Sequence, residues 1–364
     1  MGIRIARSWK KNGHAGYCVC LQLSLAVVVG GLWNQIHSTA SAEDRASTQP
    51  AEKSAEVNDA ERIAAALKLG LPMVQKAATR YPDHRKCFSC HHQTLPLLAM
   101  TSGRASGATI DETVLKTQAE FTQASFQKQK EDLLAGKGIG GKAMTVGYGL
   151  WALRLANWPA DEITEAMVEY LLKTQSEDGH WELHSIRPPM EDSTAMCAVL
   201  VIAGLRKYAG ESQQAEMEKV VAKAGAWLAG ATPRSQEDKA ARLWGSHLLS
   251  SSREDLNAAR DAVLAGQRED GGWAQLEEMA SDAYATGQTL FVLRSTGFDV
   301  TAPAYRRGVA FLLATQRDDG SWVVQTRSKP VQVYFDNGDP HGANQFISTP
   351  TTCWALSALA MPPR

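Results

Sequence analysis

The sequence predicts an all-α protein whose helices close into a ring of six inner and six outer helices. Three observations support this prediction. One seven-residue phrase recurs along the chain, two kinds of helical segment alternate between its copies, and no segment shows the alternation of apolar and polar residues expected of a strand. Repeats spaced by some tens of residues are typical of stacked or ring-closed helical units.

The recurring phrase has the form Gln-x-x-Asp-Gly-x-Trp, and each copy follows a short apolar run. The copies are Gln175–Trp181, Gln267–Trp273 and Gln316–Trp322, with a weaker copy at Lys223–Leu228. Glycine adopts the left-handed conformation at low cost, so Asp-Gly is expected to end the preceding helix. The Trp that follows can then pack back on the helix end and fasten it to the next repeat.

The segments between the copies are of two kinds. One kind is amphipathic and leads into the phrase, and the other is apolar on nearly all faces. Helices of the second kind belong in the interior. They are Leu95–Met100, Thr145–Leu153, Thr194–Leu205, Ala241–Leu249, Ala283–Leu293 and Thr351–Leu359. Six such helices inside six amphipathic ones form an α/α toroid, and its closure removes the need for the polar end caps of an open solenoid.

A family resemblance follows from these repeats. The segment Arg307–Gln316, continued by Gly320 and Trp322, resembles the QW motif of squalene–hopene cyclases and related terpenoid cyclases, and Lys223–Leu228 resembles its first half. From about residue 60 to residue 364 the chain resembles the α/α-toroid superfamily of those cyclases and the prenyltransferase β subunits. The resemblance implies the fold first, because one fold hosts many chemistries.

The bulk composition and the N-terminus restrict where the protein works. The chain has 364 residues and a formal net charge of −1, so no basic excess indicates a nucleic-acid partner. Basic residues from Arg4 to Lys11, an apolar run over Tyr17–Trp33 and the sequence Ala40-Ser41-Ala42 predict a cleaved signal peptide of residues 1–42. We therefore expect a periplasmic or secreted protein with a disordered linker at 43–58, a toroid domain at 59–364 and no membrane span after cleavage.

The rim formed by the N-termini of the inner helices is the expected site, and Cys87-Phe88-Ser89-Cys90-His91 precedes the first of them. This spacing predicts covalent haem c, with both thiols bonded to the haem, His91 on the iron, and a redox partner. His92, His341 or Met100 could supply a second iron ligand. A local disulfide, a zinc site using Cys87, Cys90 and a histidine, and a chance match at a helix start are the alternatives.

A second candidate site resembles the Asp-x-Asp-Asp-Thr-Ala acid motif of the cyclases. In Pro189–Ala195, Asp192 and the pair Thr194-Ala195 match, whereas Met190 and Ser193 replace the flanking acids. The resemblance implies an isoprenoid-processing enzyme with Asp192 as the acid, and Asp282 is a further candidate. The alternative is that both aspartates cap helices.

The interior and a late loop leave further alternatives open. Several aromatic residues either face a substrate cavity or pack in the core; they are Tyr148, Trp151, Trp244, Tyr284 and Trp354. A third function is a non-catalytic module that holds an apolar molecule or a partner. The long loop at 323–347 is expected to act as a lid, substrate contact or ligand through Lys329, Tyr334, Asp336, Asp339 and His341, unless these residues form Asx turns.

Overall fold

The computed structural model describes residues 42–329 and 333–361. The chain divides into two compact units, Met1–Glu52 and Lys53–Arg364, and the second unit holds the repeats. The predicted signal peptide lies outside the described residues, apart from its last position. No described helix has both the length and the apolar character needed to cross a bilayer.

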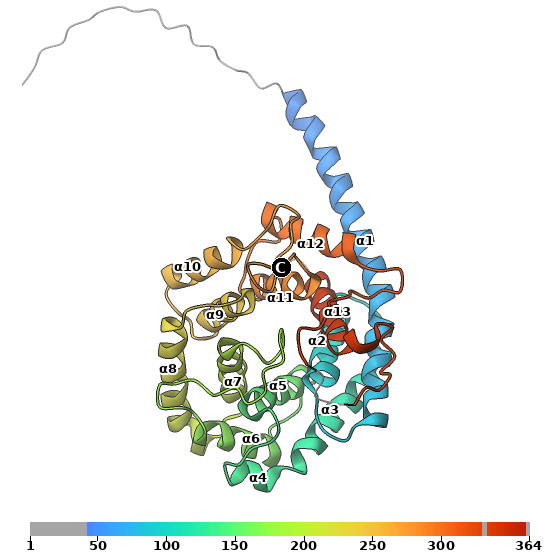
Figure 1. Ribbon diagram of the computed structural model, residues 1–364. Coiled ribbons are helices and arrows are strands. Elements are labelled where there is room, and N and C mark those ends of the chain that lie inside the picture. The colour runs from blue at the N-terminus through green and yellow to red at the C-terminus, as the bar shows by residue number, and fades with distance from the viewer. Residues whose placement is uncertain (1–41, 330–332, 362–364) are drawn as a thin grey trace, which may run out of the picture. The chain divides into compact units, whose positions relative to one another are not determined.

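The second unit is an α/α toroid, as predicted (Figure 1). Its inner helices are α2 (Leu95–Ala105), α5 (Lys142–Leu155), α7 (Thr194–Tyr208), α9 (Gln236–Leu248), α11 (Ala283–Ser295) and α13 (Gln345–Leu359). Each inner helix contacts the next one, and α13 returns to α2, which closes the ring. Within the described ranges only two isolated β-bridges accompany the helices.

Outer helices alternate with the inner ones along the chain. They are α1 (Ala42–His84), α3 (Glu112–Gln127), α6 (Glu162–Lys173), α8 (Gln214–Gly230), α10 (Arg253–Leu264) and α12 (Pro303–Thr315). Shorter elements complete the chain: the π-helical turn η1 (Cys90–Thr94), α4 (Lys130–Leu134), η2 (Glu211–Gln213) and η3 (Gly342–Asn344).

Burial explains which helices lie inside. In α13 every residue except the half-buried Phe346 is buried, whereas in α10 only Ala259 and Val263 are. Each fully buried Leu, Ile, Val or Phe stabilises the fold by roughly 1.5–3 kcal/mol, so helices with apolar residues on all faces gain most inside the ring. Small residues allow close approach: a Cβ on Gly287 of α11 would lie 2.7 Å from the backbone nitrogen of Ala355 in α13.

The recurring phrase fastens each outer helix to the next repeat, as predicted. The indole Nε1 atoms of Trp181, Trp273 and Trp322 each donate to a backbone oxygen of the preceding outer helix, at 3.0, 2.9 and 2.9 Å. The Gln side chain that opens each phrase donates to the following outer helix: Gln175 to Val220, Gln267 to Ala304 and Gln316 to Ala66. The last of these bonds joins the final repeat to the first.

The glycine of the phrase does not end the helix, contrary to the prediction. Helix α12 ends at Thr315, before the phrase begins, and Gly320 lies in the turn beyond it. Gly320 has φ +84°, and a Cβ there would lie 2.5 Å from the Leu69 carbonyl group of α1. The glycine is therefore required by a left-handed turn pressed against the next outer helix.

Two predicted boundaries are wrong. Helix α13 begins at Gln345, so Pro350 lies inside it instead of in its first turn. Helix α9 begins at Gln236 instead of Ala241, because its first turn is polar and the apolar pattern misses it.

Candidate functional site: an acidic cluster at the rim

The segments that begin the inner helices meet at one rim, as predicted. The Cys90 thiol lies 3.7 Å from Oε1 of Glu191, which precedes α7. The Ser193 hydroxyl donates to Asp238 of α9 at 2.6 Å, and the backbone nitrogen of Gln236 donates to the Gln275 carbonyl at 3.1 Å. Residues from distant repeats therefore come together here.

Glu237 is the most perturbed acid at this rim. It stands in the first turn of α9 and is 6% exposed. Burial, followed by the nearby Asp238 and Asp192, raises the pKa of its carboxyl to about 8. The group is therefore protonated at neutral pH, and the Gln288 side chain opposes only part of the increase. A protonated carboxyl in a polar cavity can act as a general acid.

Glu237 lines a small cavity at the rim, which we call the rim cavity. Its volume is about 10 Å³, and its polar lining includes Asp192, Glu237, Gln275, Tyr284, Gln288 and Arg327. A volume of this size holds about one water molecule. The predicted acid Asp192 thus lies at the same cavity as the buried Glu237.

Asp192 does not cap α7, contrary to the capping alternative. Ser193 is the cap, and its hydroxyl accepts from the backbone nitrogen of Met196 at 2.9 Å. Glu191 has φ +54°, so the backbone turns two residues before the cap Ser193. Asp192 is left partly exposed at the rim cavity, and its backbone oxygen accepts from Arg234 at 3.5 Å.

Asp282 does cap its helix, as its capping alternative predicted. Its Oδ1 atom accepts from the backbone nitrogen of Ala285 at 2.9 Å. Burial raises the pKa of this carboxyl to about 6, although the bonds from Ala285 and Gln275 oppose the increase. Two carboxyls with raised pKa values therefore belong to neighbouring inner helices at this rim.

Aromatic side chains pack against one another inside the ring. The ring centroids of Trp151 and Trp244 are 5.3 Å apart, those of Phe291 and Trp354 5.4 Å, and those of Trp151 and Trp354 5.9 Å. These residues come from α5, α9, α11 and α13, so the cluster joins four of the six inner helices. The core-packing alternative holds for these rings.

The two cysteines of the predicted haem motif have different surroundings. Cys87 is exposed, and its Sγ atom lies 3.6 Å from the Tyr81 hydroxyl. Cys90 is buried against Glu191, and both thiols are free, so the local disulfide is not formed. Burial and the Glu191 carboxylate raise the pKa of the Cys90 thiol well above its usual value. Within residues 42–329 and 333–361, no three His, Cys, Asp or Glu side chains are placed to bind one metal ion.

This arrangement does not fit covalent haem c. Haem would require both thiols bonded to one macrocycle and the His91 ring on its iron. The Cys90 Sγ atom instead faces the core, 3.6 Å from Nδ1 of His91, whose pKa is held well below its usual value by burial and by Arg187. The neighbouring Glu191 is held by Arg187 through bonds of 2.7 and 2.6 Å. The motif serves here to anchor the segment before α7.

His92 anchors a second segment at the rim. Its Nε2 atom accepts from the Asn337 side-chain amide at 2.8 Å, and Nδ1 lies 3.2 Å from the Ser89 hydroxyl. Burial lowers the pKa of His92 to about 3, so the ring is neutral. Because the protein uses both ring nitrogens, His92 is not free to bind a metal.

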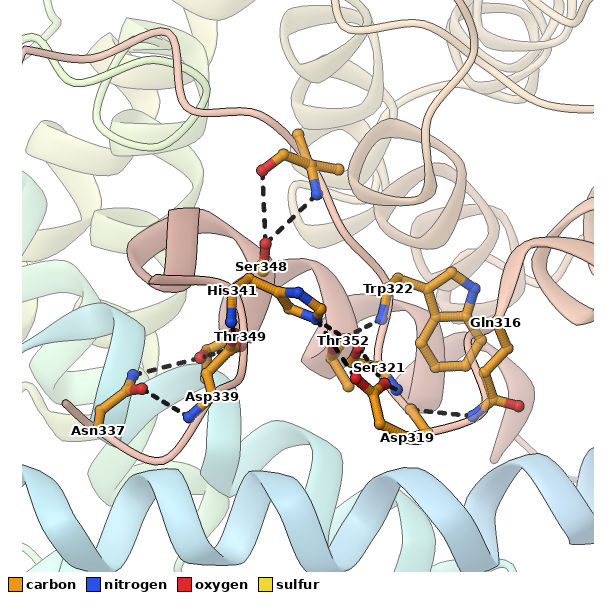
Figure 2. A network of polar contacts seen from close by, with 12 residues as sticks. Gln316, Asp319, Ser321, Trp322, Asn337, Asp339, His341, Ser348, Thr349 and Thr352 are labelled. Carbon is orange, nitrogen blue, oxygen red and sulfur yellow. Dashed lines mark hydrogen bonds and ion pairs between the residues drawn. The ribbon is translucent and has the colours of Figure 1, made fainter. Parts of the chain in front are cut away.

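The late loop is built from Asx turns, as its alternative predicted (Figure 2). Side-chain oxygens of Asp336, Asn337 and Asp339 accept from the backbone nitrogens of Gly338, Asp339 and His341. His341 bonds to the Ser321 hydroxyl at 2.6 Å, and Asp339 accepts from Thr349 at 2.9 Å. These residues hold the loop on α13 and do not line the rim cavity.

The start of the same loop does reach the rim cavity. Nε of Arg327 donates to Oε1 of Gln275 at 2.9 Å, and the Ser328 hydroxyl donates to the Pro188 carbonyl at 3.1 Å. The segment before α7 and the segment after Trp322 therefore meet over the rim. Of the predicted lid residues, Lys329 and Tyr334 are exposed, and Asp336 is exposed and pairs with Arg80 at 3.2 Å.

Several residues at the rim cavity were not predicted, above all Glu237, Gln275, Gln288 and Arg327. A signal for Glu237 exists in the sequence. Ser235 followed by Glu237 and Asp238 is a typical helix start, and it places both acids at the rim. Gln288 and Arg327 have no local pattern that distinguishes them.

Comparisons with known proteins agree with the fold. No family model matches the chain. A squalene–hopene cyclase from Bradyrhizobium diazoefficiens is 28% identical over 225 residues, which cover 55% of this chain and 32% of that protein. The match thus spans about a third of the cyclase.

Solved structures give the same result at lower identity. A type II terpene cyclase, MstE from Scytonema, in complex with geranylgeranyl dihydroxybenzoate is similar with a TM-score of 0.55 and 12% identity, covering 84% of this chain and 99% of that one. A glycosidase in complex with glucose is similar with a TM-score of 0.52 and 11% identity, covering 84% and 99%. Because these identities are low and the bound molecules differ, the likeness shows a terpene-cyclase-like α/α toroid and leaves the chemistry to the site.

Proposed function

We propose that the rim cavity is an acid–base site that acts on one end of an apolar, isoprenoid-like molecule, with Glu237 as the proton donor. The observation that supports this most is the buried Glu237 carboxyl, which lines the rim cavity and is protonated at neutral pH. The likeness to a squalene–hopene cyclase and to a terpene cyclase with an isoprenoid-bearing substrate supports the substrate class.

The chemistry follows from the groups present. The Glu237 carboxyl gives its proton to one alkene carbon of the substrate, and the alkene π electrons form the new C–H bond. The second alkene carbon becomes cationic, and loss of a neighbouring proton to a base restores neutrality.

The carboxylate left on Glu237 has favourable neighbours. Gln288 and Arg327 both act on the Glu237 carboxyl in the direction that favours its charged form. Asp192 also acts on the Glu237 carboxyl, whose pKa it raises, and it is partly exposed. We therefore assign to Asp192 the transfer of a proton from solvent to Glu237. This gives Asp192 a supporting role in place of the principal acid expected from the motif.

The test is turnover of squalene and of geranylgeranyl dihydroxybenzoate, followed by mass spectrometry. Glu237→Gln keeps the shape and removes the proton, so turnover should fall at least about a hundredfold, as is usual for loss of a general acid. Glu216→Gln on the exposed surface of α8 is the matched control and should keep full turnover. Unchanged product formation by Glu237→Gln would refute the role of Glu237.

A second candidate is a non-catalytic module that holds an apolar molecule. The small volume of the rim cavity and the mutual packing of the interior aromatic rings favour it. This candidate predicts that wild-type protein binds squalene or geranylgeranyl dihydroxybenzoate and that the compound is recovered unchanged. Glu237→Gln should bind the same compound equally well.

A further inference from the structure

One repeat boundary lacks the complete recurring phrase. Residues 174–193 connect α6 to α7 and residues 265–282 connect α10 to α11, and each connection contains a full copy. Between α8 and α9 there are only residues 231–235, which contain no tryptophan. Leu228 of α8 corresponds to Leu312 of α12, whose backbone oxygen accepts from the indole of its phrase. The chain therefore has no such indole to cover the end of α8.

A cavity of about 360 Å³ lies at this boundary, among α7, α8 and α9, which contact one another (Figure 1). We call it the junction cavity. Its lining includes Thr194, Trp227, Leu228, Arg234, Asp238 and Arg242. Small-molecule sites commonly have volumes of about 300–1,000 Å³, so the junction cavity, unlike the rim cavity, has the size of a ligand site.

Two guanidinium groups at the junction cavity keep donors for a ligand. Arg242 donates to the backbone oxygens of Ala229 and Ala231, at 2.7 and 3.5 Å, where α8 ends. The Arg234 guanidinium donates to the backbone oxygen of Asp192 at 3.5 Å. A guanidinium group carries more N–H donors than these bonds use. Neither group forms an ion pair with a carboxylate of the described residues.

Asp238, the acid in this lining, is 7% exposed and is bonded within the protein. Its Oδ1 atom accepts from the Ser193 hydroxyl at 2.6 Å, and its Oδ2 atom accepts from the backbone nitrogen of Arg234 at 2.8 Å. The two arginines and this carboxylate leave a balance of one positive charge, and the first turn of α7 at Thr194 adds partial positive charge. A singly charged anion matches this balance, whereas a phosphate dianion would exceed it close to Asp238.

Trp227 gives the junction cavity a flat apolar surface. It is half-buried, and its ring stacks on that of His180, with 5.3 Å between the centroids and 26° between the planes. His180 in turn bonds to Asp178 at 2.5 Å, so the stacked pair is held in place. The buried Leu228 and Ala195 also line the cavity. An aromatic ring of a ligand packs favourably against an indole in an offset or edge-on arrangement.

We propose that the junction cavity binds a small aromatic carboxylate, with Arg234 and Arg242 on its carboxylate group and Trp227 against its ring. The planar guanidinium fork matches the geometry of a carboxylate and forms charge-assisted hydrogen bonds with it. This inference goes beyond the proposed function and does not depend on it, because Glu237 and the rim cavity take no part in the site.

The experiment measures binding of 2-naphthoate and of 2-naphthamide to full-length protein by isothermal titration calorimetry. The two compounds share one ring system and differ in the charge of the polar group. We expect 2-naphthoate to bind at least about tenfold more tightly, and Arg234→Gln to remove most of that preference, because charge-assisted hydrogen bonds are the stronger ones. Arg206→Gln is the matched control. Arg206 donates to the Leu248 carbonyl at the end of α9, outside the lining of the junction cavity, so the preference should remain.

The melting temperature separates ligand binding from a structural role. Arg234 is exposed and its guanidinium makes one bond of 3.5 Å, so Arg234→Gln should melt like wild type. Arg242 also holds the last carbonyls of α8, so Arg242→Gln should melt lower and bind 2-naphthoate more weakly. If both arginine variants keep the preference for 2-naphthoate, the guanidinium groups serve only the fold and the inference is wrong. Trp227→Leu should weaken both compounds to a similar degree, and unchanged binding would remove the ring contact.

The remaining outcomes also decide the inference. Equal binding of the two compounds, or no binding of either, overturns it. Inorganic phosphate that displaces 2-naphthoate more effectively than benzoate does would overturn the carboxylate assignment. Binding of 2-naphthoate that depends on Arg234, without turnover of squalene or geranylgeranyl dihydroxybenzoate, supports this site and refutes the acid–base proposal alone. Turnover that depends on Glu237, without binding of 2-naphthoate, does the reverse.

Discussion

The Nε2 atom of His92 lies 2.8 Å from the side-chain amide nitrogen of Asn337, although the two residues are 245 positions apart. Both side chains are at most 1% exposed. His92 belongs to η1, directly before the first inner helix, and Asn337 to the loop before the last one. This bond therefore joins the two ends of the inner ring where the ring closes.

Loss of this bond should weaken the closure. Asn337→Leu leaves a buried imidazole nitrogen without its donor, so the free energy of unfolding should fall by about 1–3 kcal/mol in urea denaturation. The double variant with His92→Leu should lose less than the sum of the two single variants, since both remove one interaction. Asp336→Asn is the control, because its exposed pair with Arg80 should contribute about 0–1 kcal/mol. Strict additivity would show that the contact does not form in solution.

Glu237→Gln should make stability less sensitive to pH. The wild-type carboxyl has a pKa of about 8 in the fold and about 4.5 when unfolded, so the folded state keeps a proton that the unfolded state releases. The stability from this group is complete below pH 4.5 and is lost as pH rises through 8, by up to about 1.4 kcal/mol per pH unit.

The Gln side chain does not titrate, so the free energy of unfolding of the variant should increase relative to that of wild type from pH 5 to pH 8. Above pH 8 this difference should level off. Chemical denaturation at four pH values measures this difference, and Glu216→Gln corrects for general effects of charge. A difference that is flat with pH would mean that the carboxyl is ionised in the fold.

The cysteines should differ in reactivity. Cys87 is exposed, whereas Cys90, Cys197 and Cys353 are buried with pKa values raised by burial. A thiol-specific reagent should therefore label Cys87 in native protein and the other three only after unfolding. Cys87→Ser should abolish the fast phase in a labelling time course followed by peptide mass spectrometry. Rapid labelling of Cys90 in native protein would show that the segment before α7 does not cover this thiol.

Protein made in a host with c-type maturation machinery should be colourless. The buried Cys90 thiol faces Glu191, so we expect an intact mass equal to that of the polypeptide alone and no haem absorption. The same spectrum tests export, because cleavage after Ala42 predicts a mature chain that begins at Glu43. A mass increase of one haem, lost in Cys90→Ala, would show that the motif binds haem and that this rim folds differently.

The repeat pattern was sufficient for the fold. Helices apolar on all faces go inside, and the phrases ending in Trp181, Trp273 and Trp322 mark where each outer helix joins its successor. Parallel inner helices then bring their starts to one rim, which predicted that Asp192 and Asp282 belong to the same end as Cys90.

The site itself was only partly predictable. A helix-start pattern places Glu237 at the rim, but its raised pKa arises from burial, from its neighbour Asp238 and from Asp192, and only the folded ring supplies the burial and Asp192. The Cys87–His91 motif predicted haem from spacing alone, whereas the direction of the Cys90 side chain is set by tertiary contacts with Glu191. Local spacing therefore identified the right end of the molecule, and the haem prediction for that motif stays a prediction.

The bond from Gln316 to the Ala66 carbonyl gives the boundary between the last and first repeats the same form as the boundaries at Gln175 and Gln267. A ring of this kind has no preferred starting repeat. A chain with its folded ends linked and a new break placed between α8 and α9 should assemble the same circle of helices. Synthesis on the ribosome, in contrast, leaves this circle open until α12 and α13 emerge, so the first inner helix waits for the last one before its contacts are complete.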